Sequence, residues 1–499
     1  MSCEADGGQC RNVAARTVDS YLAVATRNAY VVALTADAAE PILSPWHMRH
    51  TYVAVLLAGA LVTPSARAQE TRALVTYVDS VANVAVAEKR TAGVSVAVVK
   101  NGRTLVAKGY GFADLENDVP ATAETVYRIG SVTKQFTSAG IMRLMEQGKL
   151  SLDDTLQKFF PSFPTQGNRV TVRHLLNHTS GIKSYTSLGP KWARVVRLDL
   201  APDSMVALFA NEPFDFKPGD AYRYNNSGYF LLGMIIEKLS GKTYAQYVQD
   251  EFFTPLGLKS TIYCDQAPLI KHRAQGYATK PAGGFINAEP LSMTQPYAAG
   301  SLCSTVGDLV RWTEALSGGK VVSPASYKLM TTPVALNDGK PIAYGFGLGT
   351  GVLAGHRQIS HNGGINGFVS ELHNYYDDSL ITVVLTNTGA LTAIQLERVI
   401  ARRALGIKDL PAVAIDASAL ERLAGDYAIG NTRMKLSVEG GRLRAQTQGA
   451  PAVGLKHVGN GRFVRDDNDD VQYEFAAGTP APSFTLRQGA NTVTATRVP

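Results

Sequence analysis

Strand-like segments bracket a long helical region in this 499-residue chain, and this order limits the folds open to it. Residues 93–100 read GVSVAVVK, and the following Asn101-Gly102 is typical of a tight turn into a second strand at 103–107. Strand patterns return after the helical region, at 344–349, 358–360, 367–375 and 380–386. We expect these strands to share one antiparallel sheet flanked by helices, with a helical block inserted between them, which is an α/β (α+β) architecture.

The predicted helices follow from apolar residues at helical spacing. They cover 71–89, 131–150, 203–210, 229–239, 244–252, 306–316 and 391–405. Together with the strands, they define one domain over residues 69–409. After Pro411 the pattern changes to short strand-like runs separated by Gly, Asn and Asp, at 434–438, 443–448, 461–464, 472–475, 483–487 and 492–497. This even spacing predicts a separate small β-barrel or sandwich over residues 417–499.

The stretch 48–68 has the pattern of a secretory signal peptide. A short cationic start precedes an apolar run at 53–62, and Ala66-Arg67-Ala68 has the form of a cleavage site. The apolar run is shorter than the roughly 20 residues that a membrane-spanning helix needs. We therefore predict a secreted or periplasmic protein with no stable membrane span after cleavage. Residues 1–47 are then interpreted as a misassigned upstream extension; the alternative is a buried helix in a longer N-terminal domain.

Composition and residue spacing indicate which kinds of ligand or partner this chain is expected to lack. The chain is 45% hydrophobic and 18% charged, which is typical of a globular protein. Its net charge of +7 is dispersed, so we expect no nucleic-acid partner. The spacing of the four cysteines and nine histidines matches no metal motif, and we predict neither a metal nor a cofactor. In an exported protein, Cys264 and Cys303 either form one disulfide or remain two small buried side chains.

Ser131 and Lys134 form a Ser-x-x-Lys motif at the start of a long amphipathic helix, which places them one turn apart on one face. A lysine that is desolvated enough to lose its proton can activate a serine as a nucleophile. The same motif occurs at Ser180 and at Ser317, but nearby glycines indicate loops there. Only Ser131 is therefore predicted to be the nucleophile.

Two further motifs follow Ser131 along the chain. Tyr224-Asn225-Asn226 is the only Tyr-x-Asn sequence, and it lies on a predicted loop before a helix. A phenol there can pass protons to a leaving group, and a carboxamide can hold a lysine and a substrate carbonyl. His361-Asn362-Gly363 is the only His-x-Gly sequence, on a predicted glycine-lined edge strand where a substrate backbone could lie close. Three ordered motifs predict a serine acyl-transfer site.

These motifs, with HLLNHTSGI at 174–182 and AAGSLCSTVGDLVRW at 298–312, resemble the serine β-lactamase and penicillin-binding protein superfamily. The similarity covers roughly residues 73–404 and points to the branch of class C β-lactamases, D-Ala-D-Ala carboxypeptidases, D-aminopeptidases and β-lactamase-like esterases. The C-terminal barrel resembles the lipocalin-like module of many relatives, whose function is accessory.

The resemblance implies catalytic roles for three residues. Ser131 would be acylated, Lys134 would be its base, and Tyr224 would be the proton shuttle and the deacylation base. It further implies that Asn226 positions these groups and that the backbone N–H groups of Ser131 and Gly364 form the oxyanion hole.

The third motif, His361 with Gly363, would bind substrate, but relatives that hydrolyse β-lactams have Lys-Thr-Gly there. Losing the permanent cation weakens the capture of a carboxylate. We therefore rank D-amino-acid peptides or esters above β-lactams as substrates. The alternatives are a class C-like β-lactamase and a penicillin- or peptidoglycan-binding sensor without turnover. Loops 185–194 and 275–295 are predicted to shape the pocket.

Overall fold

The computed structural model describes residues 64–280, 283–430, 432–448, 452–466, 468–488 and 491–498. The predicted extension 1–47 and residues 48–63 of the predicted leader lie outside this range. The predicted cleavage site falls inside the first described helix, which begins at Pro64. Among the described residues, no helix combines the length and the apolar character that crossing a membrane requires.

The α-helices are α2 (Pro64–Ala87), α3 (Thr133–Glu146), α4 (Leu156–Phe159), α5 (Val172–Leu176), α6 (Pro190–Ala193), α7 (Pro202–Phe209), α8 (Asn226–Ser240), α9 (Tyr244–Val248), α10 (Thr254–Leu256), α11 (Tyr297–Gly300), α12 (Val306–Ser317), α13 (Pro324–Thr331), α14 (Thr392–Leu405) and α15 (Ala417–Leu423). Short 3₁₀ turns occur at η1 (Gly130–Val132), η2 (Tyr185–Ser187) and η4 (Tyr376–Asp378), and η3 (Gln249–Phe253) is a π-helical turn.

The strands before the barrel are β1 (Gly93–Lys100), β2 (Arg103–Asp114), β3 (Val119–Pro120), β4 (Tyr127–Arg128), β5 (Ile262–Tyr263), β6 (Tyr277–Thr279), β7 (Phe285–Asn287), β8 (Leu302–Ser304), β9 (Val334–Ala335), β10 (Pro341–Ile342), β11 (Gly349–Leu353), β12 (His356–Ile365), β13 (Phe368–Tyr375) and β14 (Leu380–Thr386). The barrel strands are β15 (Gly425–Ile429), β16 (Thr432–Glu439), β17 (Arg442–Thr447), β18 (Val453–Gly459), β19 (Arg462–Arg465), β20 (Asn468–Phe475), β21 (Ser483–Gln488) and β22 (Asn491–Arg497).

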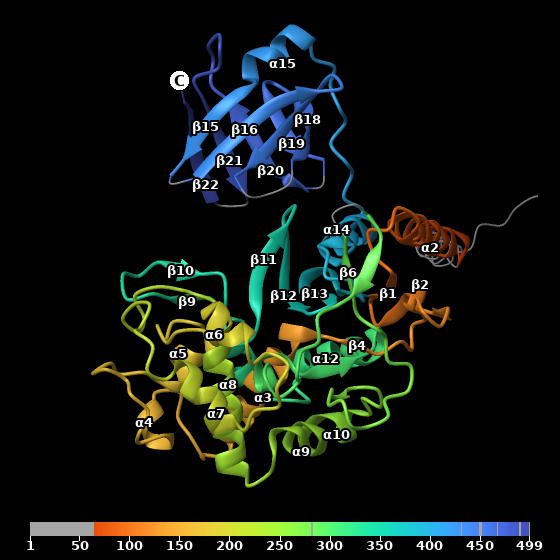
Figure 1. Cartoon of the computed structure of the whole chain (residues 1–499). Coiled ribbons are helices and arrows are strands. Elements are labelled where there is room, and N and C mark those ends of the chain that lie inside the picture. Colours follow the sequence, from red (N-terminus) through yellow and green to blue (C-terminus); the bar gives the residue numbers. More distant parts are fainter. Residues whose placement is uncertain are drawn as a thin grey trace, which may run out of the picture. The chain divides into compact units, whose positions relative to one another are not determined.

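A seven-stranded sheet joins the two ends of the domain predicted over residues 69–409, in the order β11-β12-β13-β14-β1-β2-β3 (Figure 1). The strands that pair along it are antiparallel, so the predicted sheet with its inserted helical block is confirmed. Strand β1 pairs with β14, although 280 residues separate Lys100 from Leu380. The strand predicted at 344–349 is wrong, because this stretch makes only an isolated bridge between Tyr344 and Gly349. Gly347 turns the chain there with a positive φ of 68°, and β11 begins at Gly349.

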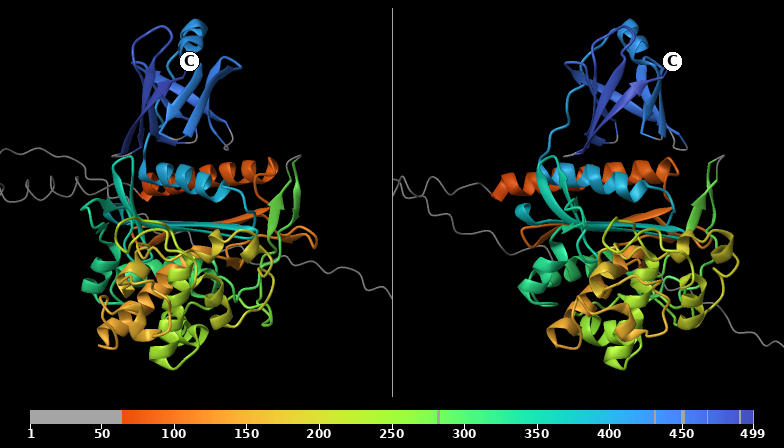
Figure 2. Two further views of the ribbon diagram at one scale, coloured as in Figure 1. Left: turned by 60° about the vertical axis from the view of Figure 1, so that its left-hand side comes forward. Right: turned by 90° about the vertical axis from the view of Figure 1, so that its left-hand side faces the viewer.

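Each face of the sheet carries its own hydrophobic core. Helices α2 and α14 cover one face, and the helical block covers the other (Figure 2). Strand β1 is buried on both faces, because its alternate side chains enter the two cores, which explains its largely apolar sequence. The catalytic motifs lie on the face that the helical block covers.

Helix α8 begins earlier than the sequence pattern predicts, at Asn226 rather than Tyr229. The Asn225 side chain accepts a hydrogen bond from the Gly228 N–H at 2.9 Å and caps the helix. Asn226 therefore lies on the first turn of a buried helix, while Tyr224 lies on the loop before it. The fixed helix start gives Asn226 a defined direction.

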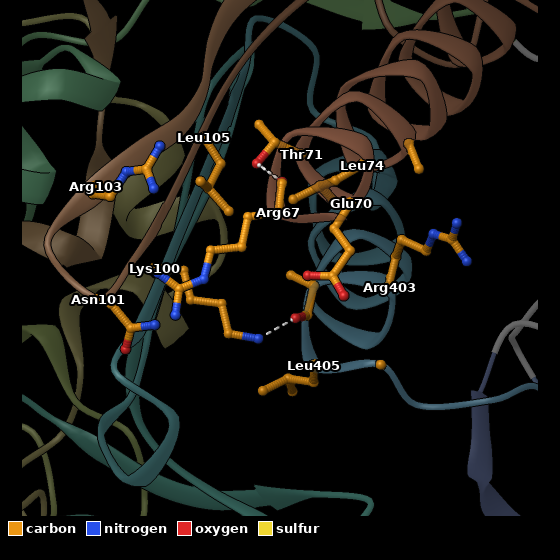
Figure 3. Close-up of a pocket in the computed structure, with 13 residues that line it drawn as sticks. Arg67, Glu70, Thr71, Leu74, Lys100, Asn101, Arg103, Leu105, Arg403 and Leu405 are labelled. Carbon is orange, nitrogen blue, oxygen red and sulfur yellow. Dashed lines mark hydrogen bonds between the residues drawn. The ribbon is translucent and has the colours of Figure 1, made fainter. Parts of the chain in front are cut away.

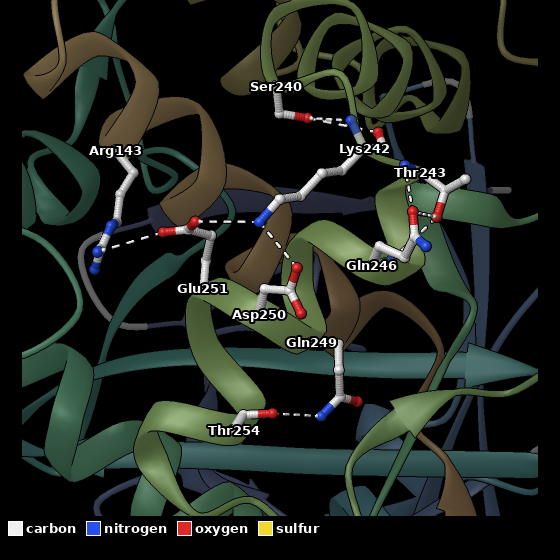
Figure 4. A network of polar contacts seen from close by, with 9 residues as sticks. All are labelled: Arg143, Ser240, Lys242, Thr243, Gln246, Gln249, Asp250, Glu251 and Thr254. Atoms are coloured by element: carbon white, nitrogen blue, oxygen red, sulfur yellow. Dashed lines mark hydrogen bonds and ion pairs between the residues drawn. The ribbon is translucent and has the colours of Figure 1, made fainter.

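A surface network of polar side chains holds the far end of α3 (Figure 4). Arg143, near the end of this helix, donates to the Val321 carbonyl at 3.0 Å and lies 3.4 Å from Glu251. Glu251 belongs to η3, where Asp250 pairs with Lys242 at 2.9 Å. These contacts tie α3, whose first turn carries the candidate lysine, to the following helical layer.

The C-terminal region forms a closed eight-stranded antiparallel barrel, β15 to β22, after the short helix α15. The predicted barrel is confirmed, and six of its strands match the predicted runs. The sequence analysis missed β15 and β18. Strand β15 is only five residues long, and β18 begins and ends among glycines, so neither has a clear alternating pattern.

Candidate active site

Ser131 lies in the 3₁₀ turn η1, directly before α3, rather than in the α-helix itself. Strand β4 leads into this turn and pairs with β8, which the Cys264–Cys303 disulfide links to the residue after β5. The two cysteine Cα atoms are 5.2 Å apart. The serine therefore follows a covalently braced strand and precedes a buried helix.

Lys134, one turn further on, has no solvent exposure. Its Nζ atom lies 3.1 Å from Ser131 Oγ, 2.8 Å from Asn226 Oδ1 and 2.8 Å from the Ala299 carbonyl oxygen. Within the described residues, no carboxylate pairs with it. Burial without a counter-charge holds the pKa of the Lys134 ammonium well below its ordinary value.

The arrangement around this amine fixes where its lone pair points. A neutral amine has two N–H donors and one lone pair. The carbonyl oxygens of Asn226 and Ala299 can only accept, so they take the two N–H groups. The third neighbour is Ser131 Oγ, whose hydroxyl proton then faces the lone pair. Lys134 can therefore accept the proton of Ser131.

Tyr224 lies beside the same pair. Its ring is 4.7 Å from Lys134 Nζ, and its hydroxyl lies within hydrogen-bonding reach of Ser131. The side chain as a whole is 37% exposed, but the hydroxyl points into the protein. Burial of the hydroxyl raises the pKa of Tyr224 well above its ordinary value, although the Ser131 hydrogen bond opposes this. The resting group is thus a protonated phenol, which can donate a proton before it can accept one.

The sequence analysis did not single out His178, although its segment HLLNHTSGI was noted. Its ring packs 4.4 Å from the ring of Tyr224 and 4.8 Å from that of Tyr344. Nδ1 accepts a hydrogen bond from the Asn225 N–H at 3.1 Å. Burial, together with the nearby Lys134, lowers the pKa of His178 well below its ordinary value. A neutral imidazole thus supports both the tyrosine and the backbone beside Asn226.

His361 also lies at the site, but it offers no charge. Its Nδ1 lies 2.6 Å from the Asn362 carbonyl and its Nε2 lies 2.9 Å from the Tyr344 hydroxyl. Burial lowers its pKa to about 3, with Lys134 adding to the effect. In the neutral ring, Nδ1–H donates to the carbonyl and Nε2 accepts from Tyr344, so both nitrogens are engaged within the protein. This geometry does not fit the expected contact of the His361 ring with substrate.

Gly363 and Gly364 follow inside β12, which extends beyond the strand pattern at 358–360. Beyond Ser360, β12 has no partner from β11, so this end of the strand is a local edge. A Cβ at Gly363 would lie 2.0 Å from the Ile129 carbonyl oxygen, so only glycine lets β12 approach the serine turn. A Cβ at Gly364 would meet nothing within 4 Å. The strand thus opens toward the site at Gly364 rather than at Gly363.

Comparisons with known proteins agree with this geometry. Residues 78–405 match the β-lactamase family. The chain belongs to that family.

Two curated relatives are similar over most of their length. Penicillin-binding protein 4* of Bacillus subtilis (strain 168) is 30% identical over 438 residues, covering 82% of this chain and 96% of that protein. The D-aminopeptidase of Brucella canis is 28% identical over 372 residues, covering 72% of this chain and 69% of that protein. Among solved structures, the D-amino acid amidase of Ochrobactrum anthropi SV3 is 25% identical with a TM-score of 0.60, covering 67% of this chain and 99% of that one. These similarities identify the chain as a serine hydrolase related to β-lactamases and penicillin-binding proteins.

A small pocket opens over Ser131 in this β-lactamase family member. It has a volume of about 100 Å³, and Ser131, Asn226 and Gly364 line it. Both loops that the sequence predicted to shape it contribute side chains. Tyr185 and Trp192 come from the first loop, and Leu291 comes from the second.

A larger cavity of about 680 Å³ lies on the sheet face that carries α2 and α14 (Figure 3). Arg67, Lys100, Arg103 and Arg403 line it with Glu70, and Lys100 donates to the Ala404 carbonyl at 2.6 Å. The Ser131 constellation belongs to the opposite core. The larger cavity therefore does not contain the candidate site, which rests on the contact between Ser131 and the buried Lys134.

Proposed function

We propose that this chain is an exported serine hydrolase that forms an acyl-enzyme on Ser131 and acts on D-amino-acid peptides or esters. The observation that carries the proposal is the buried, uncompensated Lys134, whose Nζ atom lies 3.1 Å from Ser131 Oγ. The signal-peptide pattern at 48–68 and the disulfide support export.

In the proposed first step, Ser131 transfers its hydroxyl proton to Lys134 while Oγ attacks the substrate carbonyl carbon. The carbonyl oxygen becomes an oxyanion, which the backbone N–H groups of Ser131 and Gly364 stabilise. The close approach of the two segments supports this pairing, since a Cβ at Gly130 would lie 3.1 Å from Gly364 N.

Collapse of this intermediate breaks the bond to the leaving group and needs a proton there. Tyr224 supplies it, because its raised pKa keeps the phenol protonated at rest. The phenolate that results recovers a proton from Lys134, which returns to the neutral amine. In the second half, water attacks the acyl-enzyme and passes its proton to the same pair. Ser131 then leaves with that proton, and the enzyme is restored.

The remaining motif residues would act as positioning residues. Asn226 would orient Lys134 through its side-chain oxygen. His361 would hold Tyr344, and Gly363 would let β12 approach the serine turn. The absence of a charge on His361 supports the ranking of D-amino-acid derivatives above drugs that are held by their carboxylate.

The test is a timed intact-mass spectrum of the full chain mixed with benzylpenicillin and, separately, with an activated ester of an N-acyl D-amino acid. We expect an adduct that maps to the peptide containing Ser131. It should be absent in Ser131→Ala and present in the matched Ser180→Ala. A long-lived penicillin adduct with ester turnover supports the proposed activity, while rapid drug consumption indicates a β-lactamase. Labelling that survives in Ser131→Ala would rule out this nucleophile.

A further inference from the structure

The walls of the pocket over Ser131 are apolar or polar but uncharged. The apolar part is built from two aromatic and three aliphatic side chains, namely Tyr185, Trp192, Leu291, Pro296 and Ile365. The polar part is Thr186, Asn226 and Asn366. Within the described residues, no charged side chain lines it.

The position of this pocket shows which half of a substrate it would receive. Its floor contains Gly130, Ser131 and Gly364, which surround the point of attack. Tyr224, the proposed proton donor to the leaving group, does not line it. The pocket therefore lies on the side of the acyl group. Its volume of about 100 Å³ leaves room for one side chain, so the rest of a substrate lies outside.

The two aromatic side chains of the pocket, Tyr185 and Trp192, are held in place by contacts outside the pocket. Trp192 and Tyr185 meet edge to face at 5.7 Å. The Trp192 Nε1–H donates to Gln295 Oε1 at 3.0 Å, and Gln295 is fully buried. The Gln295 amide donates in turn to the carbonyls of Val195 and Leu198, at 3.1 and 2.8 Å. Because the Trp192 N–H and the Gln295 side chain behind it are hydrogen-bonded, Tyr185 and Trp192 form a preorganised shelf.

Charges near this pocket are already engaged. Lys134 donates to two carbonyl oxygens, and His361 is neutral with both ring nitrogens occupied. On the surrounding loops, Arg197 pairs with Glu289, and Lys183 pairs with Asp215. A charged group entering the pocket would lose water and meet no charged side chain in its described walls, which is costly.

We propose that the acyl pocket selects uncharged acyl groups with one apolar side chain, which lies on the Tyr185–Trp192 shelf. This specificity rests on the proposed function, because it concerns the acyl half of the Ser131 reaction. It excludes acyl donors with a charged side chain, and it makes Trp192 a specificity-determining residue.

The test compares methyl esters of N-acetyl D-amino acids that share one leaving group. Norleucine and lysine form a matched pair of similar length, glutamate adds the opposite charge, and phenylalanine and glycine give the largest and smallest side chains. We expect kcat/KM for norleucine to exceed that for lysine by about 10- to 100-fold, with glutamate equally poor. Trp192→Ala should lower kcat/KM about 10- to 100-fold for phenylalanine and less than about threefold for glycine.

Two variants separate this effect from damage to the fold. Trp192→Phe should restore most of the phenylalanine activity, and Tyr376→Ala, which removes an exposed aromatic outside the pocket, should change no ratio. A lysine or glutamate ester as good as norleucine, or equal losses for phenylalanine and glycine in Trp192→Ala, would overturn the proposed specificity while Ser131 catalysis stands.

Labelling of Ser131 by a fluorophosphonate reports on the nucleophile independently. If no ester is turned over, the same ranking is read from how strongly each ester slows this labelling. Failure of Ser131 to react with the fluorophosphonate would contradict the proposed function itself.

Discussion

Ser131-Val132-Thr133-Lys134 and Ser180-Gly181-Ile182-Lys183 share one motif within a single domain, yet their surroundings differ in charge and burial. Lys134 is fully buried and contacts only neutral acceptors. The Lys183 side chain is 30% exposed, and its Nζ lies 2.8 Å from Asp215 Oδ1. Ser180 is itself buried, and its Oγ accepts a hydrogen bond from the Ile182 N–H at 3.3 Å.

The difference shows that the spacing of a serine and a lysine does not make a catalytic pair. What matters is the removal of the lysine from both water and carboxylates, because either one favours the charged ammonium, which cannot accept a proton. The four predictions below test this explanation, from the largest expected effect to the smallest.

Replacing each lysine by methionine gives the largest contrast. Lys134→Met removes the proposed base and should lower kcat about 10⁴-fold or more, as with the loss of other members of a catalytic unit. Lys183→Met removes only a partly exposed ion pair and should leave kcat within about threefold. Steady-state kinetics with an N-acetyl D-amino-acid ester, together with circular dichroism of both variants, measures this. Equal losses in two folded variants would contradict the comparison.

Tyr224→Phe asks whether the Ser131 site needs an acid as well as a base. The substitution keeps the ring against His178 and removes only the hydroxyl. We expect kcat to fall about 10²- to 10⁴-fold, the usual contribution of a positioned proton donor. An ester with a good leaving group, such as p-nitrophenyl, should suffer less than a methyl ester, because its departure needs less protonation. Equal loss for both leaving groups would argue against Tyr224 as the proton donor.

Much of the fold could be predicted because it depends on local patterns. The apolar run of β1 and the Asn101-Gly102 turn indicated the start of the sheet, and helical periodicity indicated α3 and α12. The segment 344–349 was wrongly predicted to be a strand because it alternates apolar residues with glycine. In the structure, a Cβ at Gly345 would lie 2.0 Å from the Met330 carbonyl oxygen, a packing constraint that no local pattern reveals.

The candidate site was predictable in its residues but not in its electrostatics. Ser131, Lys134, Tyr224 and Asn226 converge as the motifs indicated. The Ala299 carbonyl belongs to the backbone, which every residue has. Its contact with Lys134 therefore cannot be predicted from the type of residue at position 299. The neutral state of His361 depends on burial and on the nearby Lys134, which comes from a separate segment of the chain.

Asn226→Asp would place a carboxylate beside Lys134, as Asp215 lies beside Lys183. The new carboxylate would take the place of an oxygen now 2.8 Å from Nζ. An opposite charge raises the pKa of the ammonium, by about one to three units for close pairs. Because only the neutral amine accepts the Ser131 proton, the acid limb of the pH profile of kcat/KM should move to higher pH by about the same amount.

Asn226→Ala is the matched control for that shift, since it removes the same oxygen without adding a charge. Its acid limb should not move upward, although its kcat should fall because Lys134 loses an orienting contact. Profiles of both variants between pH 5 and pH 10 would settle the point. Similar upward shifts in the two would mean that hydrogen bonding, and not charge, controls the lysine.

Asp215→Asn makes the converse change at the second motif, and we expect the smallest effect. Asp215 also pairs with Arg223 at 3.0 Å, and both cations are partly exposed, so water can replace the carboxylate. The free energy of unfolding should fall by about 1 kcal/mol or less, measured by denaturant titration. Ser180 should remain unlabelled by a fluorophosphonate, because Lys183 stays in contact with water after its counter-ion is gone. Labelling of Ser180 in this variant would show that the Asp215 carboxylate alone prevents Lys183 from activating Ser180. An unreactive Ser180 would show that the lysine must also be removed from water.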